Sequence, residues 1–199
     1  MARPREYDRE EVLDQAIEVF CQHGYEGTSV QDLVDHMGIN RGSLYGAFGD
    51  KHRLFLAALH RYEETFHSTI LQRLAQGGSA MRAVRRVFED VVRECSCDEG
   101  RKGCLMTNSA IELAAHDRDT AALVAANFSR LEEAFLKALR TAQSDGELCE
   151  KQDPRALARF LTSSLQGLRV MGKACPDRVL LRDVVRVTLS VLEETKGDN

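Results

Sequence analysis

The sequence contains no tryptophan, only three prolines and no long apolar run among its 199 residues. Few prolines suit a helical chain, because proline interrupts the interior of a helix. No apolar stretch approaches the roughly 20 residues that span a bilayer, so a membrane-spanning helix is excluded. The N-terminus, MARPREYDREE, also lacks the apolar segment of a signal peptide. We therefore expect a cytoplasmic protein that makes no contact with a membrane.

Positive charge is scarce in the N-terminal third of the chain. The whole sequence carries a net charge of −4, and residues 1–66 hold seven Lys or Arg against twelve Asp or Glu, a net charge of −5. A nucleic-acid-binding function would therefore require cations that gather on one face, with the acidic residues between positions 8 and 18 turned away from it. The candidate cations are Arg3, Arg5, Arg41, Lys51 and Arg53.

Residues 28–48, TSVQDLVDHMGINRGSLYGAF, have the pattern of two short helices joined by a tight turn. Thr28 and Gln31 have the spacing of a capping box at the start of the first helix. Gly38 suits the left-handed position that ends a helix, and Asn40 can cap the second helix. One apolar face of the first helix is formed by Val30, Leu33, Val34 and Met37. This arrangement predicts a helix-turn-helix that presents its second helix to a DNA groove.

The outward face of the second helix carries short polar groups that suit DNA. The Tyr45 hydroxyl can reach a phosphate, and Arg41 can read a guanine edge or neutralise a phosphate. Lys51 adds its charge to the free amides at a helix start, which together favour a phosphate. The candidate DNA-contacting residues are Thr28, Asn40, Arg41, Gly42, Ser43, Tyr45 and Lys51. Periodicity alone fits equally well a three-helix packing module that touches no DNA.

The longer segment GYEGTSVQDLVDHMGINRGSLYGAFGDKHRLF resembles the N-terminal domain of the TetR family of repressors. The matching features are the Gly-aromatic-x-x-Thr-Ser start, the glycine turn, the Gly-Ser-Leu-Tyr-x-x-Phe helix and the Lys-x-x-Leu that opens the next helix. The resemblance covers roughly residues 5–65. It implies a homodimeric transcriptional regulator, expected to be a repressor, that binds a palindromic double-stranded DNA operator and is released from it by a small hydrophobic effector.

The rest of the chain continues in helical periodicity, so the expected fold class is all-α with about nine helices. The N-terminal three-helix helix-turn-helix domain is predicted to occupy residues 1–50, followed by a linking helix at about 51–75. The C-terminal helical domain, for effector binding and dimerisation, is predicted at 76–199. The break between the two is the sequence QGGS at 76–79.

The last predicted helix, about 178–194, carries an apolar arc that is wide for the terminal helix of a monomer. It would bury one edge in its own domain and the other against a second copy, so the last two helices, about 154–174 and 178–194, are the expected dimer interface. Gly167 and Gly172 are candidates for a close approach of helices there.

The resemblance places an effector pocket between the linking helix and the helices around residues 81–140. Aromatic and polar residues set in apolar stripes are the candidate lining, although ordinary core packing explains each of them as well. The candidates are Phe66, His67, Phe88, Asn108 and Phe128.

Three cysteines, Cys95, Cys97 and Cys104, form a cluster in the sequence. One interpretation is structural or incidental thiols. Another is a thiol or electrophile switch, because neighbouring cations and a helix start favour a thiolate. A third is a soft-metal site, which would need a further ligand such as His116. We assign no metal and no cofactor. The sequence shows no nucleophile paired with a base, so we do not expect an enzyme.

Overall fold

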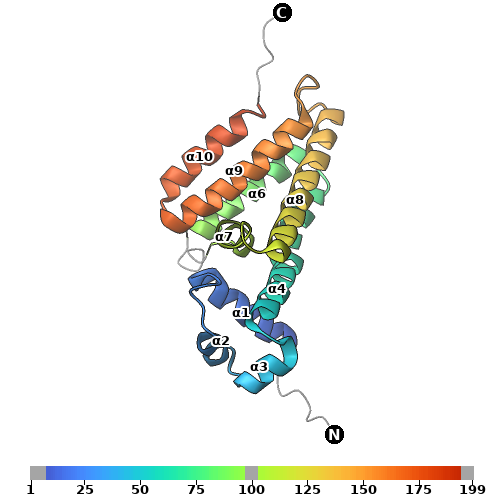
Figure 1. The fold of residues 1–199 in the computed structure, drawn as a ribbon. Coiled ribbons are helices and arrows are strands. Elements are labelled where there is room, and N and C mark those ends of the chain that lie inside the picture. Colours follow the sequence, from blue (N-terminus) through green and yellow to red (C-terminus); the bar gives the residue numbers. More distant parts are fainter. Residues whose placement is uncertain (1–7, 97–102, 194–199) are drawn as a thin grey trace, which may run out of the picture. The chain divides into compact units, whose positions relative to one another are not determined.

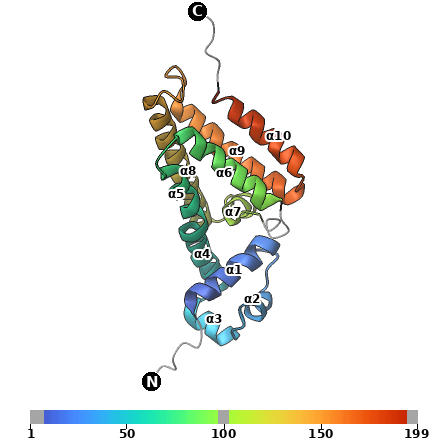
Figure 2. The ribbon, with the colours of Figure 1, turned by 180° about the vertical axis from the view of Figure 1, so that it is seen from behind.

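The computed structural model describes residues 8–96 and 103–193, apart from the side chains of Phe66 and His67. All regular structure in this part of the chain is helical, which confirms the all-α prediction (Figure 1; Figure 2). None of the helices within these ranges is long and apolar enough to cross a membrane. Contacts divide the chain into two compact units: unit 1 comprises residues 1–67 and 104–125, and unit 2 comprises residues 68–103 and 126–199.

Unit 1 is built from short helices with well-formed ends. Side chains of Asp8, Ser29, Asn40 and Asp50 accept hydrogen bonds from backbone amides at the starts of the first four helices. Such bonds satisfy amides that have no partner within a helix. The elements are α1 Arg9–His23, α2 Val30–Met37, α3 Arg41–Phe48, α4 Lys51–Tyr62, the π-helix η1 Glu63–His67, α7 Leu105–Glu112 and the beginning of α8 Arg118–Ser144.

The capping box of α2 lies one residue later than predicted. Ser29, not Thr28, is the cap: its hydroxyl accepts from the Asp32 amide at 3.1 Å, and the Asp32 carboxylate accepts from the Ser29 amide at 2.8 Å. The helix dipole favours a carboxylate at this position. Gln31 is uncharged and gains no such stabilisation. The prediction that Thr28 and Gln31 form the box was therefore wrong.

The predicted linking helix is helical from 51 to 75 but not uniform. The π-helix η1 interrupts it, and α5 Ser68–Ala75 follows directly. The Thr65 hydroxyl donates to the Arg61 carbonyl at 2.9 Å, a bond that disturbs regular α-helical spacing. The division between the compact units falls at the end of η1, between His67 and Ser68.

The unit boundaries differ from the predicted domains, which placed all of 76–199 in one C-terminal domain. Residues 104–125 belong to unit 1 because α7 packs against α1 and α4. Unit 2 contains the remaining helices, and α10 stops at Ser190 instead of near 194. They are α5, α6 Ala80–Cys95, the rest of α8, α9 Pro154–Ala174 and α10 Arg178–Ser190.

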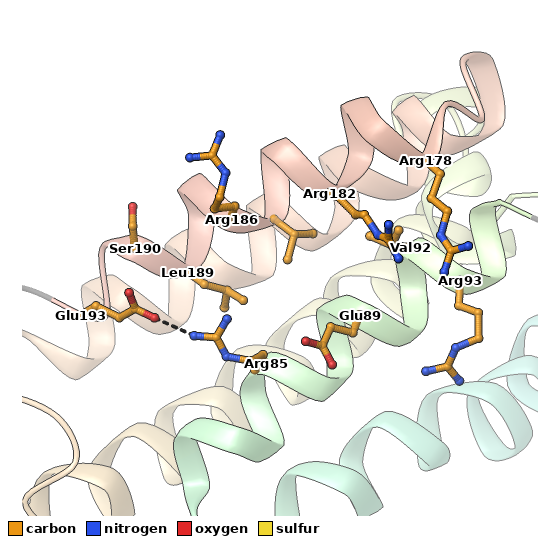
Figure 3. Close-up of a pocket in the computed structure, with 11 residues that line it drawn as sticks. Arg85, Glu89, Val92, Arg93, Arg178, Arg182, Arg186, Leu189, Ser190 and Glu193 are labelled. Carbon is orange, nitrogen blue, oxygen red and sulfur yellow. Dashed lines mark hydrogen bonds and ion pairs between the residues drawn. The ribbon is translucent and has the colours of Figure 1, made fainter.

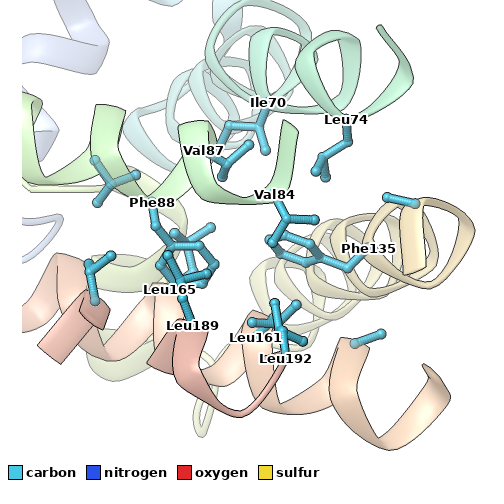
Figure 4. Close-up of a cluster of buried hydrophobic side chains, with 14 of the residues drawn as sticks. Ile70, Leu74, Val84, Val87, Phe88, Phe135, Leu161, Leu165, Leu189 and Leu192 are labelled. Atoms are coloured by element: carbon cyan, nitrogen blue, oxygen red, sulfur yellow. The ribbon is translucent and has the colours of Figure 1, made fainter. Parts of the chain in front are cut away.

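The core of unit 2 is formed by apolar faces of all its helices (Figure 4). Phe88 from α6 and Phe135 from α8 lie with ring centroids 6.1 Å apart, and both are buried. Val84, Leu161 and Leu165 pack in the same cluster. Burial of these apolar side chains is the main favourable contribution to the stability of the unit.

Gly172 allows α9 to approach α6 closely. A Cβ at this position would lie 2.5 Å from both Cβ and Sγ of Cys95. Gly172 therefore packs inside its own subunit, and the prediction that it serves a dimer interface was wrong. Gly167, by contrast, is exposed, and a Cβ there would meet nothing within 4 Å.

Candidate nucleic-acid interface

Helix α3 has one buried and one exposed face, as predicted. Leu44 and Phe48 anchor the helix in the core of unit 1. Arg41, Gly42 and Tyr45 lie on the exposed side, and Tyr45 is 47% exposed. The helix therefore presents a polar surface, with an aromatic hydroxyl, that is not needed for packing.

The start of α3 is held in place by its own cap. The exposed Asn40 side chain accepts a hydrogen bond from the Ser43 amide at 2.8 Å. The Ser43 side chain itself is half-buried. A side-chain cap fixes the first turn of a helix, and this turn carries the residues predicted to contact DNA.

Arg41 is connected to α2 through a side-chain network. Its Nη2 donates to Gln31 Oε1 at 3.0 Å, and Gln31 Nε2 donates to Asp35 Oδ1 at 2.7 Å. All three side chains are exposed. A guanidinium has five N–H donors, so this bond orients Arg41 and leaves donors for a phosphate or a guanine edge.

Lys51 is not free to act only as a phosphate-binding residue, because its ammonium also stabilises unit 1. Its ammonium donates to the carbonyls of Tyr25 at 2.9 Å and Thr28 at 3.0 Å, and it lies 4.1 Å from the centroid of the Tyr25 ring. An ammonium has three donors, so one N–H remains for a DNA phosphate. The sequence could not show this because Lys51 is far from both carbonyls along the chain.

Thr28 does not present its hydroxyl to solvent. The side chain is 1% exposed, and its hydroxyl donates to the Gly24 carbonyl at 2.5 Å. The prediction that this hydroxyl reaches a phosphate was wrong, because the hydroxyl closes the turn between α1 and α2 instead.

The acidic residues of α1 are partly neutralised within unit 1. The Arg61 guanidinium forms two hydrogen bonds with the Asp14 carboxylate, at 2.9 and 3.0 Å, and one with Glu10 at 2.8 Å. Arg53, at the start of α4, is 74% exposed and forms an ion pair with Asp50 at 3.7 Å, so its role on a cationic face stays a prediction. The other two predicted cations, Arg3 and Arg5, lie outside the described residues.

Glu112 is a residue that sequence analysis missed. Its carboxylate, at the end of α7, accepts hydrogen bonds from the backbone amides of Tyr25 at 2.9 Å and Glu26 at 2.8 Å. These amides follow Gly24, whose φ of 74° lies in the left-handed region and whose absent Cβ would lie 2.7 Å from a Glu112 oxygen. The only signal in the sequence was a lone carboxylate within the apolar segment around α7.

We predict that Glu112→Gln lowers the free energy of unfolding by about 1–3 kcal/mol. Glutamine keeps one acceptor and directs an amide donor at a backbone N–H, so one backbone amide loses its partner. Urea denaturation measures the change. Glu26→Gln removes the same charge from an exposed neighbouring side chain and should change stability by less than about 0.5 kcal/mol. Equal stability of both variants would contradict this role of Glu112.

Asp117 connects the start of α8 to α4. Its carboxylate accepts from the Thr120 hydroxyl at 2.5 Å, lies 2.7 Å from His52 Nε2, and accepts from the Asp119 amide at 3.1 Å. Hydrogen bonds from Thr120 and then from His52 favour the ionised form and hold the pKa of Asp117 at about 2. This pKa is depressed in the folded state, so its contribution to stability is complete above the ordinary Asp value and is lost as pH falls toward 2.

We therefore expect the stability of the native protein to fall between about pH 4 and pH 2 in part because of Asp117. Asp117→Asn should be less stable at neutral pH and should show a shallower decrease over this window. Urea titrations at a series of pH values measure the slope. Asp119→Asn, which changes an exposed carboxylate two residues away, should keep the native slope. An unchanged slope in Asp117→Asn would refute the assignment.

The predicted pocket residues are distributed over both units. Phe88 is buried in the core of unit 2, and Phe128 is half-buried on α8. The Asn108 amide donates to the Cys21 carbonyl at 3.3 Å within unit 1. The side chains of Phe66 and His67 lie outside the described residues. A role of these five residues in an effector pocket stays a prediction.

The cysteine cluster is not exposed where it is described. Cys95 is buried against Gly172, and Cys104 is buried at the N-cap of α7, while Cys97 lies outside the described residues. Among the residues of known placement, no three His, Cys, Asp or Glu side chains gather as metal ligands would. Cys104 stands at a helix start, but its burial shields the thiol, and a switch at this residue stays a prediction.

Comparisons with known proteins agree with this geometry. The sequence profile described as bacterial regulatory proteins of the tetR family matches residues 12–58, and the profile of the tetracyclin repressor-like C-terminal domain matches residues 77–188. An uncharacterised HTH-type transcriptional regulator of Bacillus subtilis, YezE, is 42% identical over 97% of this chain and 100% of its own. The E. coli repressor ComR is 30% identical over 96% of this chain and 92% of its own.

A solved structure has the same fold. The TetR family transcriptional regulator CifR, as a cysteine mutant complexed with 26-bp double-strand operator DNA, superposes with a TM-score of 0.87 and 31% identity. The match covers 96% of this chain and 100% of that one.

Proposed function

The chain belongs to the TetR family of DNA-binding transcriptional regulators, and from this membership we propose that it is a repressor, released from its operator by a small hydrophobic effector. The observation that carries the proposal is the exposed polar face of α3, with Arg41 and Tyr45 outside and the apolar residues inside. E. coli ComR, which is similar over nearly the whole chain, is a repressor.

We propose that α3 enters the major groove of the operator. Gly42 lets the backbone come close to the DNA, and Arg41 offers its remaining donors to a base edge or a phosphate. Asn40 and Ser43 flank the first turn of α3, where a recognition helix makes its contacts. Lys51 contributes one N–H to a phosphate while it holds the turn before α2. The complex of CifR with operator DNA supports this role by similarity.

Dimerisation through α9 and α10 would supply the second α3. Both helices expose large apolar side chains, a feature that marks association surfaces when the side chains are grouped. These exposed side chains are Phe160, Val170, Met171, Val179 and Val187. A two-fold dimer fits a palindromic operator whose half-sites are separated by about one helical turn, 34–36 Å.

Release requires a change in the spacing or orientation of the two α3 helices. An effector that binds more tightly to the conformation that does not fit the operator shifts the population toward that conformation. A difference of a few kcal/mol in binding free energy between the two conformations is enough. A covalent change at a thiol is the second candidate trigger. Cys104 at the start of α7 is the candidate thiol, and because it is buried its reaction would require a local opening of α7.

Fluorescence anisotropy of labelled DNA from upstream of the protein's own gene tests the proposal. Reduced protein should bind saturably, with two chains for each duplex. Diamide treatment then separates the triggers: binding that is lost and returns with dithiothreitol supports the thiol trigger, and binding that persists supports a reversible effector. Failure of the protein to prefer this DNA over a scrambled duplex would contradict the repressor proposal for this operator.

A further inference from the structure

A basic groove runs between α6 and α10 in unit 2 (Figure 3). Its volume is about 490 Å³, within the range of about 300–1,000 Å³ typical of small-molecule sites. Seven charged side chains line the groove: Arg85, Glu89, Arg93, Arg178, Arg182, Arg186 and Glu193. Five arginines against two glutamates give this groove a net charge of +3, in a chain whose total charge is −4.

Three of the five arginines are already paired. Arg85 bonds to Glu193 at 2.6 Å and Arg186 to Asp183 at 3.1 Å. Arg93 bonds to Asp90, also on α6, at 2.7 Å. These pairs hold their guanidinium groups in place and neutralise them, so Arg178, Arg182 and Glu89 leave a net charge of +1 in the groove.

Arg178 and Arg182 form no hydrogen bond or ion pair within the described residues. Glu89 lies in the same groove, but no ion pair joins it to either of them. The two arginines stand one helical turn apart on α10, about 6 Å along its axis, and both project from the side of α10 that lines the groove with α6 (Figure 3). An anion could therefore be held by two guanidinium forks at once.

The carboxylate nearest to Arg178 in the sequence is engaged by the helix start. Asp177 caps α10 by accepting hydrogen bonds from the amides of Val179 and Leu180, and in the described part of the chain it forms no ion pair with Arg178. The floor of the groove is apolar, since Val92, Val185 and Leu189 are buried there. An apolar floor strengthens the interaction with an anion because it lowers the local dielectric constant. A bound anion would offset the repulsion among the arginines.

We propose that the α6–α10 groove binds a small polyanion that carries at least two phosphate or carboxylate groups. Arginine suits this ligand because its planar fork forms two parallel hydrogen bonds with either oxyanion. The concave shape and the small volume favour a small molecule over an extended polymer. This site is distinct from the DNA-contacting face and from the hydrophobic effector of the proposed function. It would connect α6 to α10 through the ligand.

Isothermal titration calorimetry of the full chain tests the site, with inorganic pyrophosphate in one arm and citrate in the other, at constant ionic strength. Saturable binding of one ligand per chain is expected in at least one arm, and the stronger arm identifies phosphate or carboxylate as the preferred group. The double variant Arg178→Gln/Arg182→Gln should weaken this binding at least about tenfold, because charge-assisted hydrogen bonds are removed.

Arg140→Gln is the matched control. It removes the same charge from an exposed arginine on α8, in the same unit but outside the groove. Its affinity should stay within about twofold of the native protein, because its guanidinium does not line the groove. Absence of saturable binding in both arms overturns the proposal, as does a double variant that binds like the native protein or a control that loses as much affinity. Because no DNA is present, none of these results depends on the operator.

Discussion

Replacement of Tyr45 by alanine is expected to weaken operator binding at least about tenfold and to leave the free energy of unfolding nearly unchanged. The side chain is 47% exposed and makes no hydrogen bond within the described residues, so the fold loses little. A hydroxyl donating to a phosphate is a charge-assisted bond that contributes about 1.5–3 kcal/mol. A dimer would lose this bond twice. Anisotropy titration measures the affinity, and urea denaturation measures the stability.

Two further variants separate the contributions of the Tyr45 hydroxyl and the Lys51 ammonium to DNA binding. Tyr45→Phe removes the hydroxyl alone and should reproduce most of the loss if the bond to phosphate dominates. Lys51→Ala should reduce both binding and stability, because the ammonium also holds the carbonyls of Tyr25 and Thr28. Native affinity in Tyr45→Ala would show that α3 does not contact DNA through this side chain.

Replacement of Gly172 by alanine is expected to lower the free energy of unfolding by about 1–3 kcal/mol, the usual effect of overpacking a core. The added Cβ would lie 2.5 Å from Cβ and Sγ of Cys95. Because one of these atoms is fixed to the α6 backbone, rotation of the thiol cannot relieve the contact, and α6 and α9 must separate. Thermal and urea denaturation of the full chain measure the effect.

Matched changes distinguish this contact from helix propensity. Gly167→Ala, on the same helix with open space around it, should be stabilising by up to about 1 kcal/mol. Cys95→Gly should restore part of the stability of Gly172→Ala, whereas Cys95→Ala retains the clashing Cβ and should restore less. A Gly172→Ala variant as stable as Gly167→Ala would contradict the close approach of these helices.

Local signals in the sequence were sufficient for most helices and for the exposed face of α3. Periodicity with capping residues predicted α3 with its Asn40 cap, and periodicity predicted the bounds of α9. The capping box of α2 was misplaced by one residue because Thr28 and Ser29 are both good caps, and only the bond from Thr28 to Gly24 decides between them.

Contacts between residues far apart in the chain could not be predicted from local sequence signals. Glu112 reaches the amides of Tyr25 and Glu26 across more than eighty residues, and Asp117 reaches His52 across sixty-five. These contacts explain why 104–125 joins unit 1 even though it follows the predicted domain break. The composition of this segment is apolar and helical like that of its neighbours, so nothing local marked it.

The exposed face of α3 is expected to read DNA, and the most direct measurement compares native protein with Arg41→Ala on two duplexes. One duplex carries the sequence upstream of the protein's own gene, and the other is its scrambled counterpart. Anisotropy titrations should show that the native protein prefers the first duplex and that Arg41→Ala has lost about 1–3 kcal/mol of binding, with a reduced preference if Arg41 reads a base. Identical curves for the two proteins, with no preference between the duplexes, would contradict the claim.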